Sequence, residues 1–168
     1  MKKNLLLASA LVLLCATLAS AQTAAAPSAA DKAATAKIVQ LLEASTQTYT
    51  KAKEGVWVVK FKGNHLADIS VIVVHSEGLL VMFAPVAEKA AYKAAPELLQ
   101  KLLRLNDEYD RVKVAIDKDG DLLTRADFTL RLADQKEFNA NLEQVSTAAD
   151  LTYEVVKPFL TAPKPAAK

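Results

Sequence analysis

The hydrophobic pattern between residues 98 and 131 predicts a helix that leads directly into a β-hairpin. Apolar residues alternate with polar ones from Val112 to Ile116 and again from Leu122 to Leu130, as in two strands. Asp119-Gly120 between the strands is a residue pair typical of hairpin turns. Ahead of the hairpin, leucines recur at helical spacing up to Asn106, where we expect the helix to end: Leu98, Leu99, Leu102, Leu103 and Leu105.

One pairing register makes this hairpin consistent. A three-residue loop, Lys118-Asp119-Gly120, with Gly120 in the left-handed conformation, pairs Asp117 with Asp121. A shift of one residue would turn every side chain to the wrong face, so the register is strongly specified. One face then pairs Ile116 with Leu122, Val114 with Thr124 and Val112 with Ala126. The other face pairs Arg111 with Asp127 and Lys113 with Arg125.

The chain before position 98 predicts a helix, a meander of strands and the start of a second helix. We expect Asp31 to cap a helix with one apolar face, made of Ala34, Ile38, Leu41, Leu42 and Ser45. Strands follow at 49–52 and 56–61, then at 69–74, which is apolar on both faces as if covered on both sides. The strand at 79–84 is expected to close at Pro85, and Pro96 suits the first turn of the leucine-rich helix.

A last helix is predicted from Asp134 to beyond Tyr153, with Pro158 ending it. Its apolar stripe is continuous and consists of Phe138, Leu142, Val145, Ala149, Thr152 and Val156. The element order is therefore helix, three or four strands, helix, β-hairpin, helix. We predict an α+β fold of two layers around a mostly antiparallel sheet.

Residues 1–21 carry the pattern of an export signal. Lys2 and Lys3 precede an apolar run from Leu5 to Leu18, and Ala19-Ser20-Ala21 is a small-residue cleavage site. The run of about 14 residues is shorter than the roughly 20 that span a bilayer. We expect no membrane span after cleavage, and a location in the periplasm or outside the cell. The remaining sequence predicts a flexible linker at 22–31, a single domain at 32–160 and a disordered tail at 161–168.

Removal of the signal changes the charge balance and the chemistry available. Lys2 and Lys3 leave with it, so 19 of the 21 basic residues remain against 19 acidic ones. A neutral chain gives no support for nucleic-acid binding. The single cysteine, Cys15, also leaves, which excludes disulfides and thiolate chemistry in the remaining chain. The four glycines are isolated, so the chain contains no phosphate-binding loop.

The histidines do not form a catalytic or metal-binding pattern. His65 and His75 fall at opposite ends of one predicted strand and cannot share an ion within one chain. His75-Ser76-Glu77 holds the residue types of a nucleophilic triad, but contiguous residues rarely reach the required geometry. We therefore predict no catalytic, cofactor-binding or metal-binding residues.

The acidic hairpin tip resembles a calcium loop only superficially. Asp117, Asp119 and Asp121 alternate, but Gly120 falls between the second and third acids. Phe128 stands where the pattern requires glutamate. Aspartate and glycine are residues that turns select, so we predict a turn.

Three residues are candidates for binding a partner: Lys113, Arg125 and Trp57. Lys113 and Arg125 lie opposite each other, and like charges repel. Either an acid of a neighbouring strand or solvent relieves them, or an anionic partner binds there. Trp57, with Phe61 and Tyr49 nearby, is either a core residue or part of an interface at the sheet edge.

The segment from Leu98 to Arg131 resembles the YbjN-domain family, which is described as sensory transduction regulators of bacteria. The resemblance extends into the last helix through Phe138 and Leu142, and more loosely to Trp57-Val58-Val59. The matching residues of the segment are Leu102-Leu103, Leu105-Asn106, Arg111-Val112, Val114-Ala115-Ile116, Asp117, Asp119-Gly120, Leu122, Arg125 and Asp127. The resemblance implies a fold like that of type III secretion chaperones, which commonly dimerise and hold segments of partner proteins.

We therefore expect an exported, non-enzymatic binding or chaperone-like module that forms a homodimer and binds a protein or peptide. An export signal departs from the pattern of a cytoplasmic secretion chaperone. One alternative is a small-ligand-binding periplasmic domain with an apolar pocket between sheet and helices. Another is a hydrolase that uses Ser76, His75 and scattered acidic residues.

Overall fold

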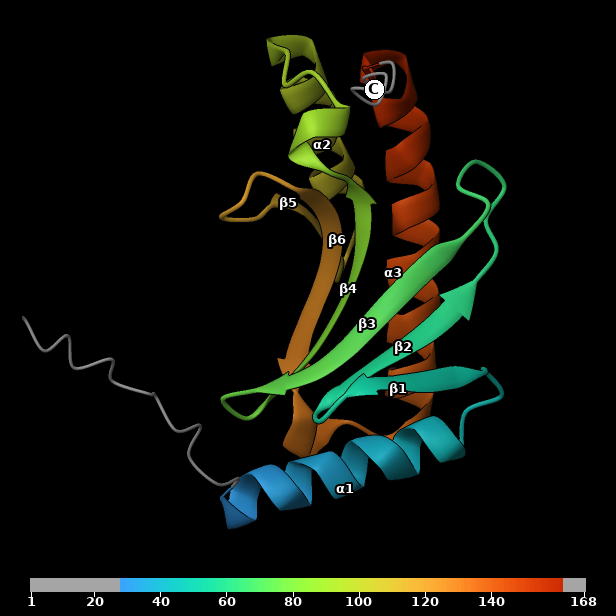
Figure 1. The fold of residues 1–168 in the computed structure, drawn as a ribbon, viewed down its shortest axis with the longest axis vertical. Helices are drawn as coiled ribbons and strands as arrows, with labels where there is room; N and C mark the ends of the chain where they lie inside the picture. Colours follow the sequence, from blue (N-terminus) through green and yellow to red (C-terminus); the bar gives the residue numbers. More distant parts are fainter. Residues whose placement is uncertain (1–27, 162–168) are drawn as a thin grey trace, which may run out of the picture.

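A six-stranded antiparallel sheet, with strand order β1-β2-β3-β4-β6-β5, forms one layer of the structure (Figure 1). The computed structural model describes residues 28–161. The predicted signal peptide, most of the predicted linker and all but the first residue of the predicted tail lie outside the described residues. The elements are α1 (Ala29–Glu43), β1 (Tyr49–Lys53), β2 (Val56–Phe61), β3 (Ile69–Ser76), β4 (Leu79–Ala87), α2 (Pro96–Glu108), β5 (Lys113–Ile116), β6 (Leu122–Thr129) and α3 (Gln135–Val156).

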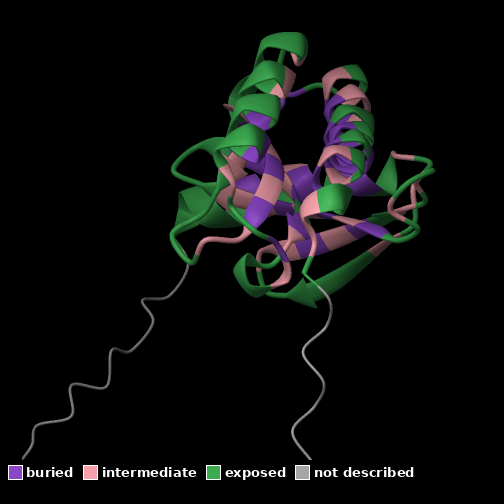
Figure 2. Cartoon of the chain, turned by 90° about the horizontal axis from the view of Figure 1, so that it is seen from above, coloured by how far each residue is buried: buried purple, intermediate pink, exposed green. Residues whose placement is uncertain are grey.

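The core lies between one face of the sheet and the helices (Figures 1 and 2). α3 packs against β3, β4 and β6, while α1 crosses the lower end of the sheet beside the start of α3. The predicted stripe of α3, from Phe138 to Val156, is buried at every position. Alternate strand residues meet it, as their two-residue period requires: Trp57, Val59, Val71, Val73, Leu80, Met82, Leu122 and Ala126. The predicted α+β class and element order are confirmed, with four strands in the meander.

The predicted hairpin register is confirmed over most of its length. Lys113 pairs with Arg125, Val114 with Thr124 and Ile116 with Leu122. Gly120 has φ of 92°, and the Asp117 N–H donates to the Asp121 carbonyl at 2.9 Å, which closes the predicted three-residue loop. The side chains of Val114 and Thr124 are both buried, so the two strands do share one inner face.

Two details of the hairpin prediction were wrong. The ladder stops at Lys113, so the pairs Arg111–Asp127 and Val112–Ala126 do not form. The Arg111 guanidinium instead makes an ion pair with Glu137 of α3. Ile116 is 46% exposed rather than buried, since it lies on the edge strand beyond the reach of α3.

Several element boundaries also differ from the prediction. α1 begins at Ala29, inside the predicted linker, and its N-cap is Ser28. Asp31 is the third residue of a capping box, because its carboxylate accepts the Ser28 N–H while its own N–H donates to the Ser28 hydroxyl. β4 passes through Pro85, which sits at an irregularity in the pairing with β6, and continues to Ala87.

The helix α2 continues past Asn106 to Glu108, which corrects the predicted helix end. Asn106 is compatible with the helix because its side chain binds the neighbouring strand. Its Oδ1 accepts the Val114 N–H at 2.6 Å, and its Nδ2 donates to the Val114 carbonyl at 3.2 Å. The amide thereby takes the place of a further strand along the outer edge of β5.

A buried carboxylate joins α3 to the loop between β2 and β3. Asp150 accepts the backbone N–H groups of Asn64, His65 and Leu66 at 3.0, 2.8 and 2.8 Å. Burial alone would raise the pKa of Asp150, but the three hydrogen bonds together lower it by more. The net pKa of Asp150 therefore lies below its ordinary value. Gly63 is required here, because a Cβ at position 63 would collide with the Asp150 carboxylate.

We predict that Asp150→Ala destabilises the protein by about 1–3 kcal/mol at pH 7, because three partly buried N–H groups lose a charged acceptor. Since the folded-state pKa is lowered, the stabilisation is present above the unfolded value and is lost as the pH falls through the folded one. Urea unfolding should therefore give a lower free energy of unfolding for Asp150→Ala than for the unmodified protein at pH 7. This difference should become smaller below about pH 4. Glu154→Ala, one turn further along α3 with an exposed carboxylate, is the control. An equal loss for both variants would contradict the assignment.

Candidate binding surface

The face of the sheet opposite α3, called the outer face below, carries mostly apolar side chains. They are Val56, Val58, Ile72, Val74, Val81, Phe83, Pro85, Ala115 and Leu123. The pairing aligns them in rows across the strands, and one row runs from Val58 through Ile72 and Phe83 to Arg125. Within residues 28–161 no helix packs on this face (Figure 1). The prediction that β3 is covered on both sides was wrong for the described part of the chain.

Lys113, Arg125 and Asp127, called the charged trio below, lie at one side of the outer face. The Asp127 carboxylate accepts from the Lys113 ammonium at 2.6 Å and from the Arg125 guanidinium at 2.7 Å. Burial alone would raise the pKa of Asp127, but the two cationic donors together lower it by more. The net pKa of Asp127 is therefore below its ordinary value. The relief expected for the two like charges thus comes from an acid two residues along β6. Two cations share one anion, so the trio keeps a net positive charge.

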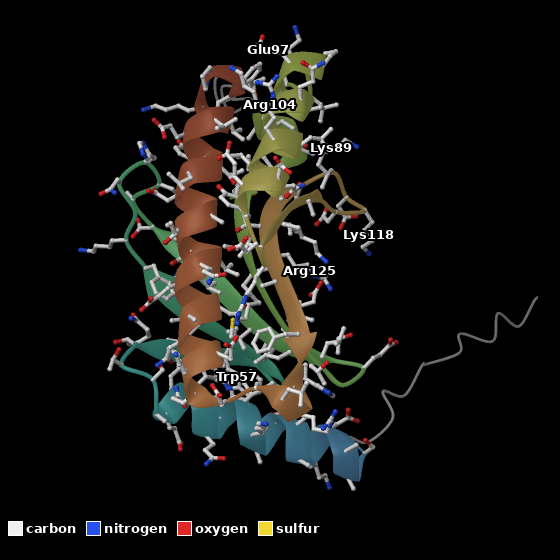
Figure 3. The ribbon with its side chains drawn as sticks, turned by 180° about the vertical axis from the view of Figure 1, so that it is seen from behind. Trp57, Lys89, Glu97, Arg104, Lys118 and Arg125 are labelled. Atoms are coloured by element: carbon white, nitrogen blue, oxygen red, sulfur yellow. The ribbon has the colours of Figure 1, made fainter. Side chains whose placement is uncertain are left out.

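Trp57 lies on the other side of the sheet from the charged trio. Its side chain is 2% exposed and belongs to the core, near α1 and α3 in Figure 3, whereas Arg125 lies on β6 away from it. The structure therefore does not bring the three predicted residues together. Lys113 and Arg125 are 56% and 42% exposed, which leaves both accessible to a partner.

The histidines are separated, and each has local partners. His65 Nε2 lies 3.3 Å from the Glu154 carboxylate. His75 Nε2 accepts the Gly78 N–H at 3.1 Å, and its Nδ1 lies 3.8 Å from the Asp31 carboxylate. Among the described residues no group of three or more histidine, cysteine, aspartate or glutamate side chains is arranged to hold a metal ion.

The aspartates of the hairpin tip have structural roles. Asp117 Oδ1 accepts the N–H groups of Asp119 and Asp121 at 2.9 Å each. Asp121 Oδ1 accepts the Lys89 N–H at 2.8 Å, and the Tyr92 hydroxyl donates to the Gly120 carbonyl at 2.9 Å. These bonds hold the tip against the segment before α2, in agreement with the predicted turn.

The extent of the outer face was not predicted, although the sequence contained a signal for it. The run from Ile69 to Val74 is apolar at both parities, and Val58, Phe83 and Leu123 add apolar residues at the outward parity of their own strands.

A second observation concerns membranes: none of the helices in residues 28–161 has both the length and the apolar character needed to span a bilayer.

We predict that Asp127→Ala destabilises the protein by about 1 kcal/mol at low salt, because Lys113 and Arg125 then face each other without an acid. Salt screens this repulsion, so the loss should shrink when unfolding is measured in about 1 M NaCl. Asp119→Ala, at the exposed hairpin tip, is the control and should show no such dependence. A loss that is independent of salt would rule out charge relief as the role of Asp127.

Comparison with known proteins places these observations in a family. The profile of the YbjN family, described as "Putative bacterial sensory transduction regulator", matches residues 35–158. No curated protein matches the chain. A chain from the crystal structure of the ExsC-ExsE complex is 14% identical, with a TM-score of 0.51 over 73% of this chain and 95% of that chain.

A second solved structure is the heterodimeric ExoU-SpcU complex from the type III secretion system of Pseudomonas aeruginosa. One of its chains is 13% identical, with a TM-score of 0.48 over 74% of this chain and 98% of that chain. At these identities the likeness to the ExsC-ExsE complex shows a shared fold. The family match covers more than half of the sequence and confirms the predicted resemblance, so this chain belongs to the YbjN family.

Proposed function

We propose that this YbjN-family protein is an exported, non-enzymatic module that binds a segment of a partner protein, in a chaperone-like or regulatory role. The observation that carries the proposal is the apolar outer face, which no helix in the described residues covers. The side chains of this face are half-buried, apart from the exposed Pro85 and the buried Val81. Contiguous apolar surface that is open to solvent marks interaction sites. The shared fold with a chain of the ExsC-ExsE complex supports the same class of function.

The charges beside the outer face define the chemistry of the partner. The charged trio carries one surplus positive charge, and Lys60 on β2 adds another at the opposite side, where its ammonium donates to the Ser70 hydroxyl at 2.6 Å. Such a rim attracts carboxylates and steers an acidic partner toward the surface. The partner segment therefore combines apolar residues for the centre with acidic residues for the rim.

The proposal places the protein in the periplasm or outside the cell. Its support is the sequence pattern of residues 1–21, with a charged start, an apolar run and a small-residue cleavage site. A chain without cysteine after cleavage folds without disulfides, and its stability then depends on the apolar core between sheet and α3.

The proposal also includes a homodimer. Leu103 of α2 is 68% exposed, and with Leu99 and Ile116 it lines a groove of about 310 Å³ between α2 and β5. We call these three residues the α2 patch. A two-fold contact sets one patch against its own copy, so a single apolar surface suffices for both subunits.

A first test separates the outer face from the rest of the surface. We expect a partner cross-linked in periplasmic extract to be retained by the full chain and reduced about tenfold by the double variant Ile72→Thr, Phe83→Ser. The control is Leu151→Ser, at an apolar residue of α3 that is 39% exposed. Circular dichroism and thermal unfolding verify that each variant is folded. Equal capture by all three proteins, or a tagged chain absent from the periplasmic and extracellular fractions, would contradict the proposal.

A second test concerns the α2 patch. We predict that Leu103→Glu converts the dimer to a monomer, because the substitution sets two carboxylates against each other at the two-fold axis. Light scattering after gel filtration measures the mass directly. Leu132→Glu, at an equally exposed leucine in the turn after β6, should leave the dimer intact. A wild-type chain that is monomeric at high concentration would refute this part of the proposal.

A further inference from the structure

The lower half of β6 is a free strand edge. β5 covers only the upper part of β6, because the ladder between them stops at the pair Lys113–Arg125 (Figure 1). Backbone groups alternate between the two sides of a strand, and the Leu130 N–H donates to the Gly78 carbonyl on the β4 side. Asp127 therefore directs its N–H and C=O groups, and Thr129 its N–H, to the side that β5 has left. The Thr129 carbonyl is used by the short 3₁₀ turn Leu130–Leu132 that follows β6. Within the described residues no turn, loop or side-chain hydrogen bond occupies the Asp127 N–H, the Asp127 C=O or the Thr129 N–H.

A pocket of about 440 Å³ lies beside this edge. Ala126, Phe128 and Leu132 supply apolar walls, and Leu132 is 65% exposed although it is a large apolar residue. The ion pair between Arg111 and Glu137 borders the pocket where β5 begins. Its size suits one large apolar side chain, and its location is the one that an additional strand beside β6 would face.

A buried polar group in the pocket has an unused acceptor. Asn141 of α3 is 3% exposed, and its Nδ2 donates to the Glu137 carbonyl at 2.7 Å. Its Oδ1 accepts no hydrogen bond from the described residues. Oδ1 is also not completely shielded from solvent, unlike the Tyr109 and Thr152 hydroxyl oxygens, which are buried without a partner. The remaining access of Oδ1 is therefore through the pocket that Asn141 lines. An acceptor in this setting calls for an N–H donor, which a peptide backbone supplies.

The charged trio lies at the upper end of the same edge. Successive side chains of an added strand point to opposite faces of the sheet. If one enters the pocket on the α3 side, its neighbours lie on the outer face, close to the surplus positive charge of Lys113 and Arg125. An acidic residue fits that position. The pattern that matches the edge is thus an alternation of apolar and acidic residues.

The chain itself does not supply such a segment. Residues 1–27 and 162–168, which lie outside the described range, contain no aspartate or glutamate. A second copy pairing edge to edge would bring two positively charged trios together, which like charges oppose. The charges therefore favour a segment of a different protein.

The geometry points to residues Asp127–Thr129 of β6 as a strand-addition site for an extended partner segment with alternating apolar and acidic residues. The segment pairs with the free N–H and C=O of Asp127 and with the free N–H of Thr129. One apolar side chain fills the pocket beside Leu132, and an N–H group donates to Asn141 Oδ1. Backbone pairing supplies affinity, while the pocket and the charged trio supply selectivity. The inference rests on the proposed function and specifies how the partner is held.

The test uses the blocked peptide acetyl-Glu-Leu-Glu-Leu-Glu-amide and the full chain. Two isomers carry N-methyl groups either on every leucine or on every glutamate, so that each blocks a different edge of the peptide. We expect one isomer to bind like the parent peptide and the other about tenfold more weakly, because strand addition uses one edge only. Amide shifts in ¹⁵N NMR spectra should centre on Asp127–Thr129 and on the Asn141 side chain.

A pair of variants provides the second measurement. Leu132→Ser should weaken peptide binding about tenfold through loss of the pocket wall, while Leu151→Ser, at an exposed leucine of α3 outside the β6 edge and the α2 patch, should not. Equal binding of both methylated isomers, or unchanged binding by Leu132→Ser, overturns the inference. Shifts that centre on Ile72 and Phe83 also overturn it but leave the proposed function in place. A third outcome separates the two sites. If Leu132→Ser weakens peptide binding but the outer-face variant captures the partner as well as the unmodified chain, the strand-addition site is supported and the outer face is ruled out as the binding surface.

Discussion

The packing of α3 against one face of the sheet is the constraint on which the rest of the structure depends. The helix has a single continuous apolar stripe, and the sheet strands alternate inward and outward residues with a period of two. One stripe can bury one face only. The other face of a six-stranded sheet is then left to solvent or to a partner, and here it carries valine, isoleucine and phenylalanine rather than polar residues. The fold and the binding proposal thus have the same origin.

Local pattern predicted well the elements whose two sides differ. The hairpin register and the stripe of α3 followed from alternation and helical spacing, because in both cases one side is apolar and the other polar. The environment of β3 was harder to predict. A run that is apolar at both parities shows that both faces of the strand are apolar, but it does not show what covers each face. Asn106 was read as a helix end because asparagine favours caps, whereas its amide is used by Val114 of a neighbouring strand. Such a tertiary hydrogen bond has no signature in local spacing.

The candidate site was accessible to sequence reasoning only in part. Lys113 and Arg125 emerged from the register, and the pairing confirms that they face each other. Asp127 as their common partner was missed, because the register assigned it to Arg111, and the chain leaves the ladder before that pair forms. The early end of β5 exposes the lower half of β6. Alternation in the sequence continues to Arg111, but the Arg111 side chain pairs with Glu137 on α3, a contact that a strand pattern does not contain.

The three free edges of the sheet differ in their protection, and this difference argues for the lower half of β6 as a functional edge. Natural sheets block exposed edges with charged side chains or with covering groups. β1 carries Lys51 and Lys53, both exposed, and β5 has its central backbone groups taken by the Asn106 amide. The Asp127 N–H and C=O and the Thr129 N–H have no covering group among the described residues, and an apolar pocket adjoins them. A protein that protects two edges and leaves the third open beside a pocket has kept that edge available for a partner strand.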